Sequence, residues 1–195
     1  MKNMKALIIY ANYRENSFTG ALRDNLAENF HNNGHEVVIR DLYDIKFNPV
    51  LTKNDLESIE KEIFPIDIMN EQKFIQWADI ICFVYPIWWS GMPAILKGYI
   101  ERIFVQGYAF EFKDDKAIPK LEGKKVVIIN STSAKNVLKD KMGIDALNTL
   151  THDCIFGFCG MEVIEHKYFE AVSRDNQKQI NKIFAEIKEI ATRVL

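Results

Sequence analysis

The sequence predicts a doubly wound α/β fold, in which a five-stranded parallel sheet of order 2-1-3-4-5 carries helices on both faces. Short apolar runs of strand length alternate along the chain with segments whose apolar residues recur every three or four positions. The apolar runs are nearly continuous, which is typical of strands that are buried on both faces of a parallel sheet. Such alternation builds right-handed βαβ units, and the doubly wound order accommodates five of their strands.

The five expected strands are apolar segments separated by polar or turn-forming residues. KALIIYA is the first of them, and Gly34 ends the helix that precedes the second. The expected ranges are 5–11, 36–41, 79–86 and 124–130, and the fifth strand lies within 154–169.

The helices are predicted from apolar stripes at helical spacing. The first stripe consists of Phe18, Leu22, Leu26 and Phe30, each four residues from the next. Further helices are expected within 46–62, 67–78, 95–104 and 180–194. No internal repeat, low-complexity tract or linker interrupts the series, so the chain 1–195 is predicted to be a single domain.

The charge balance argues against several classes of partner. The chain has 25 basic and 27 acidic residues and a net charge of −2, whereas a nucleic acid or an anionic membrane would favour a basic surface. The N-terminal apolar run has about six residues, too few for a signal-peptide core or a membrane span. We therefore expect neither nucleic-acid binding nor membrane insertion.

Metal and nucleophile chemistry have little support in the sequence. The three cysteines, Cys82, Cys154 and Cys159, are odd in number and have no CxxC spacing. The histidines lack ligand spacing with a cysteine or carboxylate, and no GxSxG motif is present. We expect no metal site, no certain catalytic side chain, a reduced chain in the cytoplasm, and chemistry that a bound cofactor supplies.

In doubly wound sheets, ligands bind beyond the carboxyl ends of the strands, where the strand order reverses. The informative loops are therefore those after Ala11, Tyr85 and Ile129. The first loop, NYRENSFTGAL, has neither a P-loop nor a GxGxxG motif, but Asn16, Ser17 and Thr19 lie at a helix start. Free N–H groups and hydroxyls at such a helix start suit a phosphate, although simple capping by Asn16 or Ser17 also explains them.

The second loop, PIWWSGMP, places two tryptophans between prolines and a glycine, where regular structure is expected to break. Trp88 and Trp89 are either core or interface residues, as single tryptophans usually are, or walls for a planar ligand. Their adjacency after a strand, with Gly91 freeing the backbone, favours a flavin or nucleotide ring.

The third loop, NSTSAKN, offers hydroxyls and backbone donors from Asn130 to Ser133. Taken on its own, it is better explained as an ordinary Ser/Thr turn. The three loops together bring polar groups, and in one case flat apolar groups, to the same edge of the sheet.

The segment YPIWWSGMPAILKGYIERIFVQGYAF resembles the central segment of the NAD(P)H:quinone oxidoreductases of the DT-diaphorase type and their bacterial relatives, including those of the modulator-of-drug-activity type. DLYDIKFNPVLTKND, EQKFIQWAD, LEGKKVVIINSTS and GFCGMEV extend the likeness. The resemblance implies a flavodoxin-like fold, a bound flavin (FAD, with FMN as the alternative), NAD(P)H as electron donor, and a homodimer with sites at its interface.

The resemblance also assigns cofactor-binding residues. It places the flavin phosphates on the first loop, the isoalloxazine ring on the second, and the ring's polar edge or the ribityl chain on the third. The residues, loop by loop, are Asn12, Ser17, Phe18 and Thr19; Pro86, Ile87, Trp88, Trp89 and Ser90; and Ser131, Thr132, Ser133 and Ala134.

The expected activity is two-electron hydride transfer from NAD(P)H to a quinone-like acceptor, in which the protein supplies positioning and electrostatics. One alternative is a flavodoxin-type electron carrier, against which the small net charge argues. A second alternative is a regulatory flavoprotein subunit of a membrane transporter.

A homodimer is also expected from the apolar residues of 95–104 and of the following segment 105–112, which is predicted to be a loop. A monomer is expected to expose part of this surface, which soluble proteins avoid when the patch is large. The alternative is that the helix is buried on both sides by its own sheet and a neighbouring helix.

Overall fold

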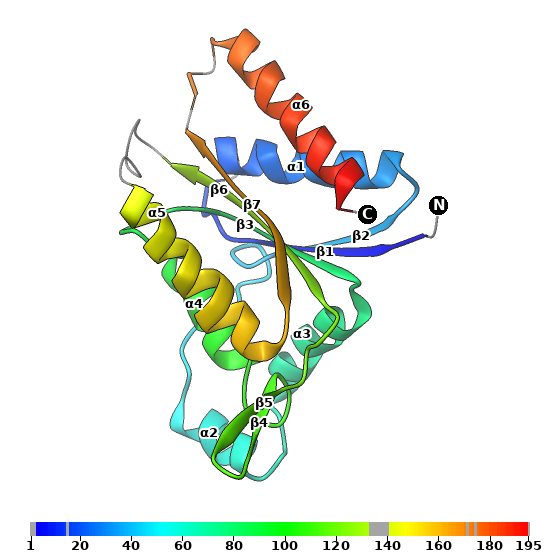
Figure 1. The fold of residues 1–195 in the computed structure, drawn as a ribbon. Helices are drawn as coiled ribbons and strands as arrows, with labels where there is room; N and C mark the ends of the chain where they lie inside the picture. The colour runs from blue at the N-terminus through cyan, green and yellow to red at the C-terminus, as the bar shows by residue number, and fades with distance from the viewer. Residues whose placement is uncertain (1–2, 15, 133–140, 171, 174, 195) are drawn as a thin grey trace.

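A computed structural model describes residues 3–14, 16–132, 141–170, 172–173 and 175–194. Its central element is a parallel sheet of five strands in the order β2-β1-β3-β6-β7 (Figure 1). The strands are β1 (Lys5–Tyr10), β2 (Glu36–Asp41), β3 (Ile80–Pro86), β6 (Lys125–Thr132) and β7 (Glu162–Glu170). The predicted order 2-1-3-4-5 is therefore confirmed, with β6 and β7 as the fourth and fifth strands of the sheet.

One face of the sheet is covered by α1 (Phe18–Asn32) and α6 (Gln177–Arg193), which lie side by side above it in Figure 1. The apolar stripe of α1 is buried at Leu22, Leu26 and Phe30, as its spacing of four predicts. These side chains share a core with alternate residues of β1, β3 and β6.

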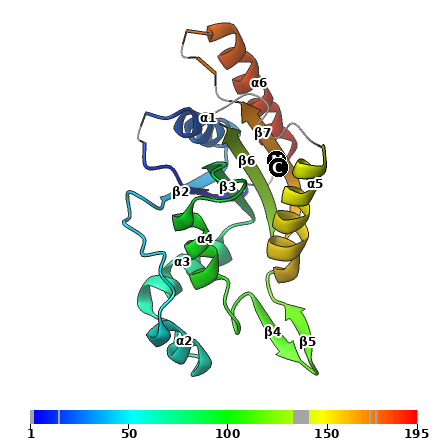
Figure 2. The same ribbon diagram turned by 90° about the vertical axis from the view of Figure 1, so that its left-hand side faces the viewer.

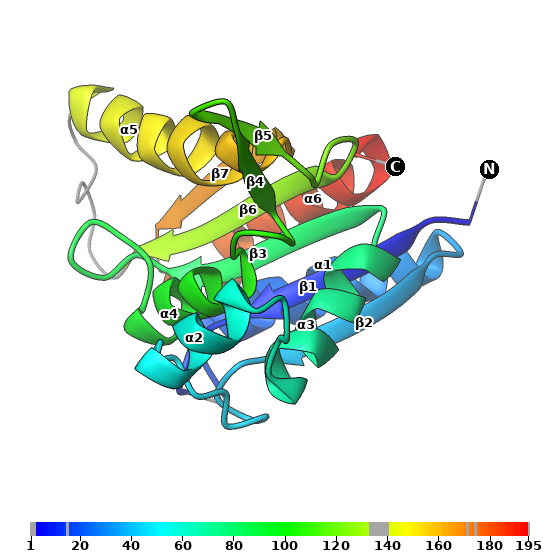
Figure 3. The same cartoon turned by 90° about the horizontal axis from the view of Figure 1, so that it is seen from below.

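The opposite face carries α3 (Ile66–Trp77), α4 (Ala94–Ile103) and a helical segment that closes the β7 edge (Figure 3). This segment consists of α5 (Lys141–Asn148), the π-helical η1 (Thr149–Phe156) and the short η2 (Gly157–Cys159). The sequence patterns do not predict this helical segment. Its second half overlaps the range 154–169, in which the fifth strand was expected. A short helix, α2 (Lys53–Glu60), precedes α3 in the chain and lies farther from the sheet than α3 in Figure 1.

A two-stranded antiparallel hairpin, β4 (Phe110–Lys113) and β5 (Lys116–Pro119), projects from the body of the chain (Figure 2). Its turn residues Asp114 and Asp115 both have positive φ, at 51° and 58°, as the twist of a tight hairpin requires. The expectation of a loop over 105–112 is therefore wrong for its last three residues.

Helix α4 is buried within its own chain. Leu96, Tyr99 and Ile103 are fully buried, and Ile100 nearly so, between the sheet, α3 and the segment around Phe47. The alternative, that the helix is buried by its own sheet and a neighbouring helix, therefore holds for most of α4, although Ile95 is only partly buried. On the following segment, the large exposed apolar side chain is Phe112 of the hairpin.

Among the described residues, no helix has both the length and the apolar character needed to cross a membrane.

Candidate functional site

The carboxyl ends of β1, β3 and β6 meet at the point where the strand order reverses. The Ala11 N–H donates to the Val84 carbonyl at 3.2 Å, and the Ile87 N–H donates to the Ser131 carbonyl at 2.8 Å. These bonds join the starts of the first two loops to the neighbouring strands. The three segments predicted to form one site therefore lie at one edge of the sheet.

A buried polar chain links the first segment to the third. The Asn12 amide donates to Thr19 Oγ1 at 3.2 Å, and Thr19 Oγ1 lies 2.6 Å from Ser131 Oγ, so that one hydroxyl donates to the other. All three side chains are buried. Because 112 residues separate Thr19 from Ser131, the sheet topology alone brings them together.

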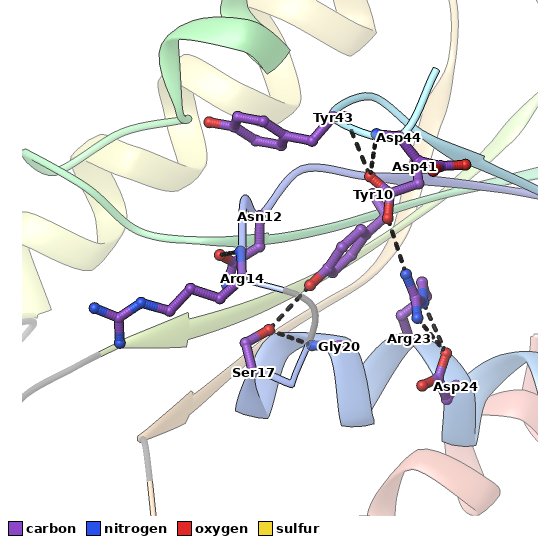
Figure 4. A network of polar contacts seen from close by, with 10 residues as sticks. All are labelled: Tyr10, Asn12, Arg14, Ser17, Gly20, Arg23, Asp24, Asp41, Tyr43 and Asp44. Atoms are coloured by element: carbon purple, nitrogen blue, oxygen red, sulfur yellow. Dashed lines mark hydrogen bonds and ion pairs between the residues drawn. The ribbon is translucent and has the colours of Figure 1, made fainter. Parts of the chain in front are cut away.

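The first helix begins at Ser17, whose hydroxyl accepts a hydrogen bond from the Gly20 N–H at 3.0 Å (Figure 4). Capping by Ser17 is therefore confirmed. The same hydroxyl lies 3.0 Å from the buried Tyr10 hydroxyl, and burial raises the pKa of Tyr10. The positive end of α1 thus points toward the loop, where an anion would be stabilised by the helix dipole.

A second set of contacts joins this helix to the end of β2. The Arg23 guanidinium lies over the Tyr10 ring at 4.4 Å and forms ion pairs with Asp24 and with Asp41 at 2.7 and 3.1 Å (Figure 4). Asp41 in turn accepts from the Tyr43 N–H at 3.1 Å. The turn that carries Tyr43 is therefore fixed relative to the first loop.

The two tryptophans form part of a tight turn. Trp88 and Gly91 exchange backbone hydrogen bonds of 3.1 and 3.0 Å, and the residues between them, Trp89 and Ser90, have φ values of +50° and +56°. Two successive positive φ values are characteristic of a type I′ turn and are strained for residues other than glycine. Trp88 is half-buried, whereas Trp89 is fully exposed.

A row of aromatic rings borders the site. Tyr13 lies between Tyr43 and Trp88, with ring-centroid distances of 6.4 and 5.9 Å. Arg14 donates to the Tyr13 hydroxyl at 2.8 Å. The row comes from the ends of β1, β2 and β3, and Tyr13 and Tyr43 were not singled out from the sequence, because nothing local marks them as partners of Trp88.

The remaining predicted residues lie around these features. Phe18 is half-buried at the start of α1, and Pro86 and Ile87 are buried below the turn. Ser131 and Thr132 are buried and belong to the end of β6 rather than to a loop. Ser133 and Ala134 lie outside the described residues.

The arrangement suits a ligand with an anionic part and a flat apolar part. Hydroxyls and a helix N-terminus occupy one side, and an exposed indole on a turn occupies the other. A flavin mononucleotide unit has both chemical parts, so the residues present fit a flavin. In the described ranges, no group of three or more His, Cys, Asp or Glu side chains is placed to hold a metal ion.

Two histidines that are 14 residues apart in the sequence lie together beside this site. His166 of β7 and His152 of η1 approach to 2.8 Å between Nδ1 and Nε2, and His166 Nε2 lies 2.6 Å from Asn130 Oδ1. The Tyr168 ring stacks on that of His166 at 4.2 Å. The signal available in the sequence was the placement of His166 and Tyr168 two apart, and hence on one face of a strand.

Acid is expected to destabilise the fold partly through His166. Burial lowers the pKa of His166 to about 3, with a further contribution from His152, whereas the unfolded ring titrates near 6.5. Between these values the unfolded state binds a proton that the folded state does not, so stability falls as the pH drops from 6.5 towards 3. One such group contributes at most about 1.4 kcal/mol per pH unit.

The groups that face His166 are His152, Tyr168 and Asn130, and Asp153 acts on His152. Urea unfolding at pH 7.5 and 5.0 should therefore show a smaller loss of stability in His166→Gln than in the wild type. Equal losses in the two proteins would contradict this account.

The family comparison covers almost the whole chain. A family described as having a flavodoxin-like fold matches residues 4–192. The chain belongs to this flavodoxin-like family. The fold and the family resemblance inferred from the sequence are therefore confirmed.

Individual relatives of this flavodoxin-like chain have oxidoreductase names. It is 37% identical to an "uncharacterized NAD(P)H oxidoreductase" of Haemophilus influenzae, over 85% of this chain and 83% of the relative. It is 30% identical to the ribosyldihydronicotinamide dehydrogenase (quinone) of Pongo abelii, over 84% of this chain and 80% of the relative.

Among solved structures, the FMN-dependent NADH-azoreductase of Bacillus anthracis, in complex with FMN, aligns with a TM-score of 0.77 and covers 99% of both chains. Its sequence identity is 20%, so this likeness supports the fold.

Proposed function

We propose that the protein is an NAD(P)H-dependent flavin oxidoreductase that reduces quinones or similar acceptors by two-electron transfer. The observation that carries the proposal is the meeting, at one edge of the sheet, of the Asn12–Thr19–Ser131 polar chain with the exposed turn of Trp89. The names of the relatives at 37% and 30% identity support the same reaction class.

The proposed cofactor residues follow the three segments. Asn12, Ser17, Phe18 and Thr19 would hold the phosphate, 86–90 the ring, and 131–134 its polar edge or the ribityl chain. A bound flavin would supply the two-electron chemistry between NAD(P)H and the acceptor. The side chains of the site would bind and orient the reactants and exclude water, and N–H groups of the Trp turn would stabilise negative charge.

The purified protein is expected to be yellow, and heat or acid should release its flavin for chromatography. We propose FAD, on the family resemblance, and FMN is the alternative because the Bacillus anthracis azoreductase is in complex with FMN. A colourless protein that takes up neither FAD nor FMN would contradict the proposed function.

The reaction is tested by adding menadione to the purified protein with NADH and, separately, with NADPH. An enzyme should consume the nicotinamide stoichiometrically with menadione. A flavodoxin-type electron carrier would bind flavin without this turnover, and a transporter subunit would turn over weakly until its partner is present.

We also propose a homodimer, now on the exposed rings near the hairpin rather than on the apolar residues of α4. Phe112 is 58% exposed on the hairpin, and Phe110 contacts both Phe112 and the exposed Phe158 with ring distances of 5.6 and 4.9 Å. A two-fold contact would bury these rings. Light scattering at micromolar concentration should give twice 22.6 kDa, and a monomer that still reduces menadione would exclude a shared site.

We further propose that 1–195 forms one domain and that the protein works in the cytoplasm. Cys82, Cys154 and Cys159 are free thiols, which fits a reducing compartment.

A further inference from the structure

A chain of neutral polar side chains runs from η1 to the ends of β3 and β6. Asn130 is fully buried, and its amide nitrogen donates to the Tyr85 carbonyl at 3.2 Å. Its amide oxygen faces His166 Nε2 at 2.6 Å, and His166 Nδ1 faces His152 Nε2 at 2.8 Å. The chain thus connects three elements, η1, β7 and β6, to the backbone of β3.

The hydrogen-bond pattern fixes the proton positions along this chain. Because the Asn130 nitrogen donates to a carbonyl, its oxygen accepts, and His166 Nε2 must carry the hydrogen. His166 Nδ1 is then an acceptor, which receives the Nε2–H of His152. The Tyr168 hydroxyl donates to Asn148 Oδ1 at 2.7 Å, so it does not compete for that position. Burial lowers the pKa of both imidazoles, which favours their neutral forms.

The far end of the chain is continuous, along β3 and β6, with the proposed ring site. Tyr85 is followed by Pro86 and Ile87, which lead into the Trp turn, and Asn130 is followed by Ser131. The Ile87 N–H donates to the Ser131 carbonyl at 2.8 Å. The Asn130–Tyr85 bond and the Ile87–Ser131 bond therefore join the same two strand ends, one residue apart on β6 and two residues apart on β3.

We propose that His166 is a positioning residue for the cofactor site, which holds Asn130 so that Asn130 fixes the strand end carrying the Trp turn. This inference rests on the proposed function, because it takes the flavin ring to bind against that turn. Among the contacts of the described residues, the hydrogen bond to the Asn130 oxygen comes from the His166 Nε2–H. Without that donor the buried Asn130 oxygen would lose its bond to His166, and the side chain would turn away from its present position.

Two substitutions separate positioning from simple packing. His166→Gln retains an N–H donor close to the position of Nε2, whereas His166→Leu fills similar space without a donor. Because a buried hydrogen-bond acceptor loses its partner, His166→Leu is expected to weaken flavin binding about tenfold. His31→Leu, at an exposed position on α1, is the matched control.

The first measurement is equilibrium titration of the full-length wild type and variants with FAD and with FMN, followed by flavin fluorescence. We expect about tenfold weaker binding in His166→Leu, and values within about twofold of the wild type in His166→Gln and His31→Leu. Rescue by glutamine is the result that a packing role does not predict. Equal loss in the leucine and glutamine variants would overturn the proposal.

The second measurement does not require a flavin. Hydrogen exchange of the Ile87 amide, compared with amides of α6 in the same sample, reports whether the Ile87–Ser131 bond is still held. It should be about tenfold faster in His166→Leu and unchanged in His166→Gln. An unchanged Ile87 amide in His166→Leu would overturn the proposal even if flavin binds. Failure of the wild type to bind either flavin would instead contradict the proposed function, with the Ile87 amide still deciding the role of His166.

Discussion

Replacing Arg102 by methionine is expected to lower the free energy of unfolding by about 3–5 kcal/mol, because it leaves a buried carboxylate without its cation. The Arg102 side chain is only 4% exposed. Its Nε and one terminal nitrogen each donate to a different oxygen of Asp55, both at 3.2 Å, and the other terminal nitrogen donates to Asp67 at 2.6 Å. One guanidinium of α4 therefore holds α2 and the first turn of α3.

The carboxylate that would be left behind is held in its charged form by these contacts. Burial acts to raise the pKa of Asp55, but hydrogen bonds from Arg102 and Thr52 outweigh it, and the pKa is lowered. Arg102 also donates to the Asn48 carbonyl at 3.0 Å. Gly98 of α4 packs against the residue that follows Asn48. A Cβ at Gly98 would lie 2.1 Å from the Pro49 carbonyl oxygen, so α4 approaches this backbone too closely for any larger residue.

Lys97→Met on the same helix is the matched control. Lys97 forms an exposed i,i+4 ion pair with Glu101 at 2.6 Å, which is worth at most about 0.5 kcal/mol. Urea unfolding of both variants at neutral pH should separate them by several kcal/mol. A loss in Arg102→Met as small as that in Lys97→Met would show that the buried ion cluster contributes little. Because α4 follows the Trp turn directly, weaker flavin binding should accompany the loss of stability.

The three central strands, β1, β3 and β6, were predictable because burial on both faces leaves a nearly continuous apolar run. Strands of the hairpin lack this signal: β4 and β5 have four residues each, and most of them are exposed. The segment α5–η1 was missed for another reason. CIFGF reads equally well as a strand or as a buried helical turn, since a short apolar run carries no decisive periodicity.

At the site, the sequence located the three segments but not the contacts between them. The edge of a parallel sheet collects the residues that follow its strands, which is why Asn12, Trp88 and Ser131 could be grouped in advance. Their actual partners depend on tertiary geometry: Thr19 meets Ser131, and His166 meets both His152 and Asn130. The apolar excess of α4, which suggested a dimer interface, instead reflects contact with two layers of its own chain.

Trp89→Ala is expected to weaken flavin binding about ten- to a hundredfold without unfolding the protein. The indole is fully exposed, so its removal takes no packing from the core, and exposed substitutions usually change stability by less than about 0.5 kcal/mol. If the ring of the flavin lies against it, the lost apolar contact is worth about 1–3 kcal/mol. Trp89→Phe, which keeps a flat ring, should bind nearly as the wild type does.

Trp77→Ala supplies the opposite case for this test. Trp77 ends α3 at the amino edge of the sheet, is half-buried, and packs on the core and near Lys5. Loss of Trp77 should reduce stability and leave flavin affinity unchanged. Loss of Trp89 should weaken flavin binding and leave stability nearly unchanged. Fluorescence titration with FAD and FMN, together with urea unfolding of each variant, measures both quantities. Unchanged affinity in a folded Trp89→Ala protein would show that the strained, solvent-facing turn does not hold the cofactor, and the ring site would then have to be assigned to Tyr13 and Trp88.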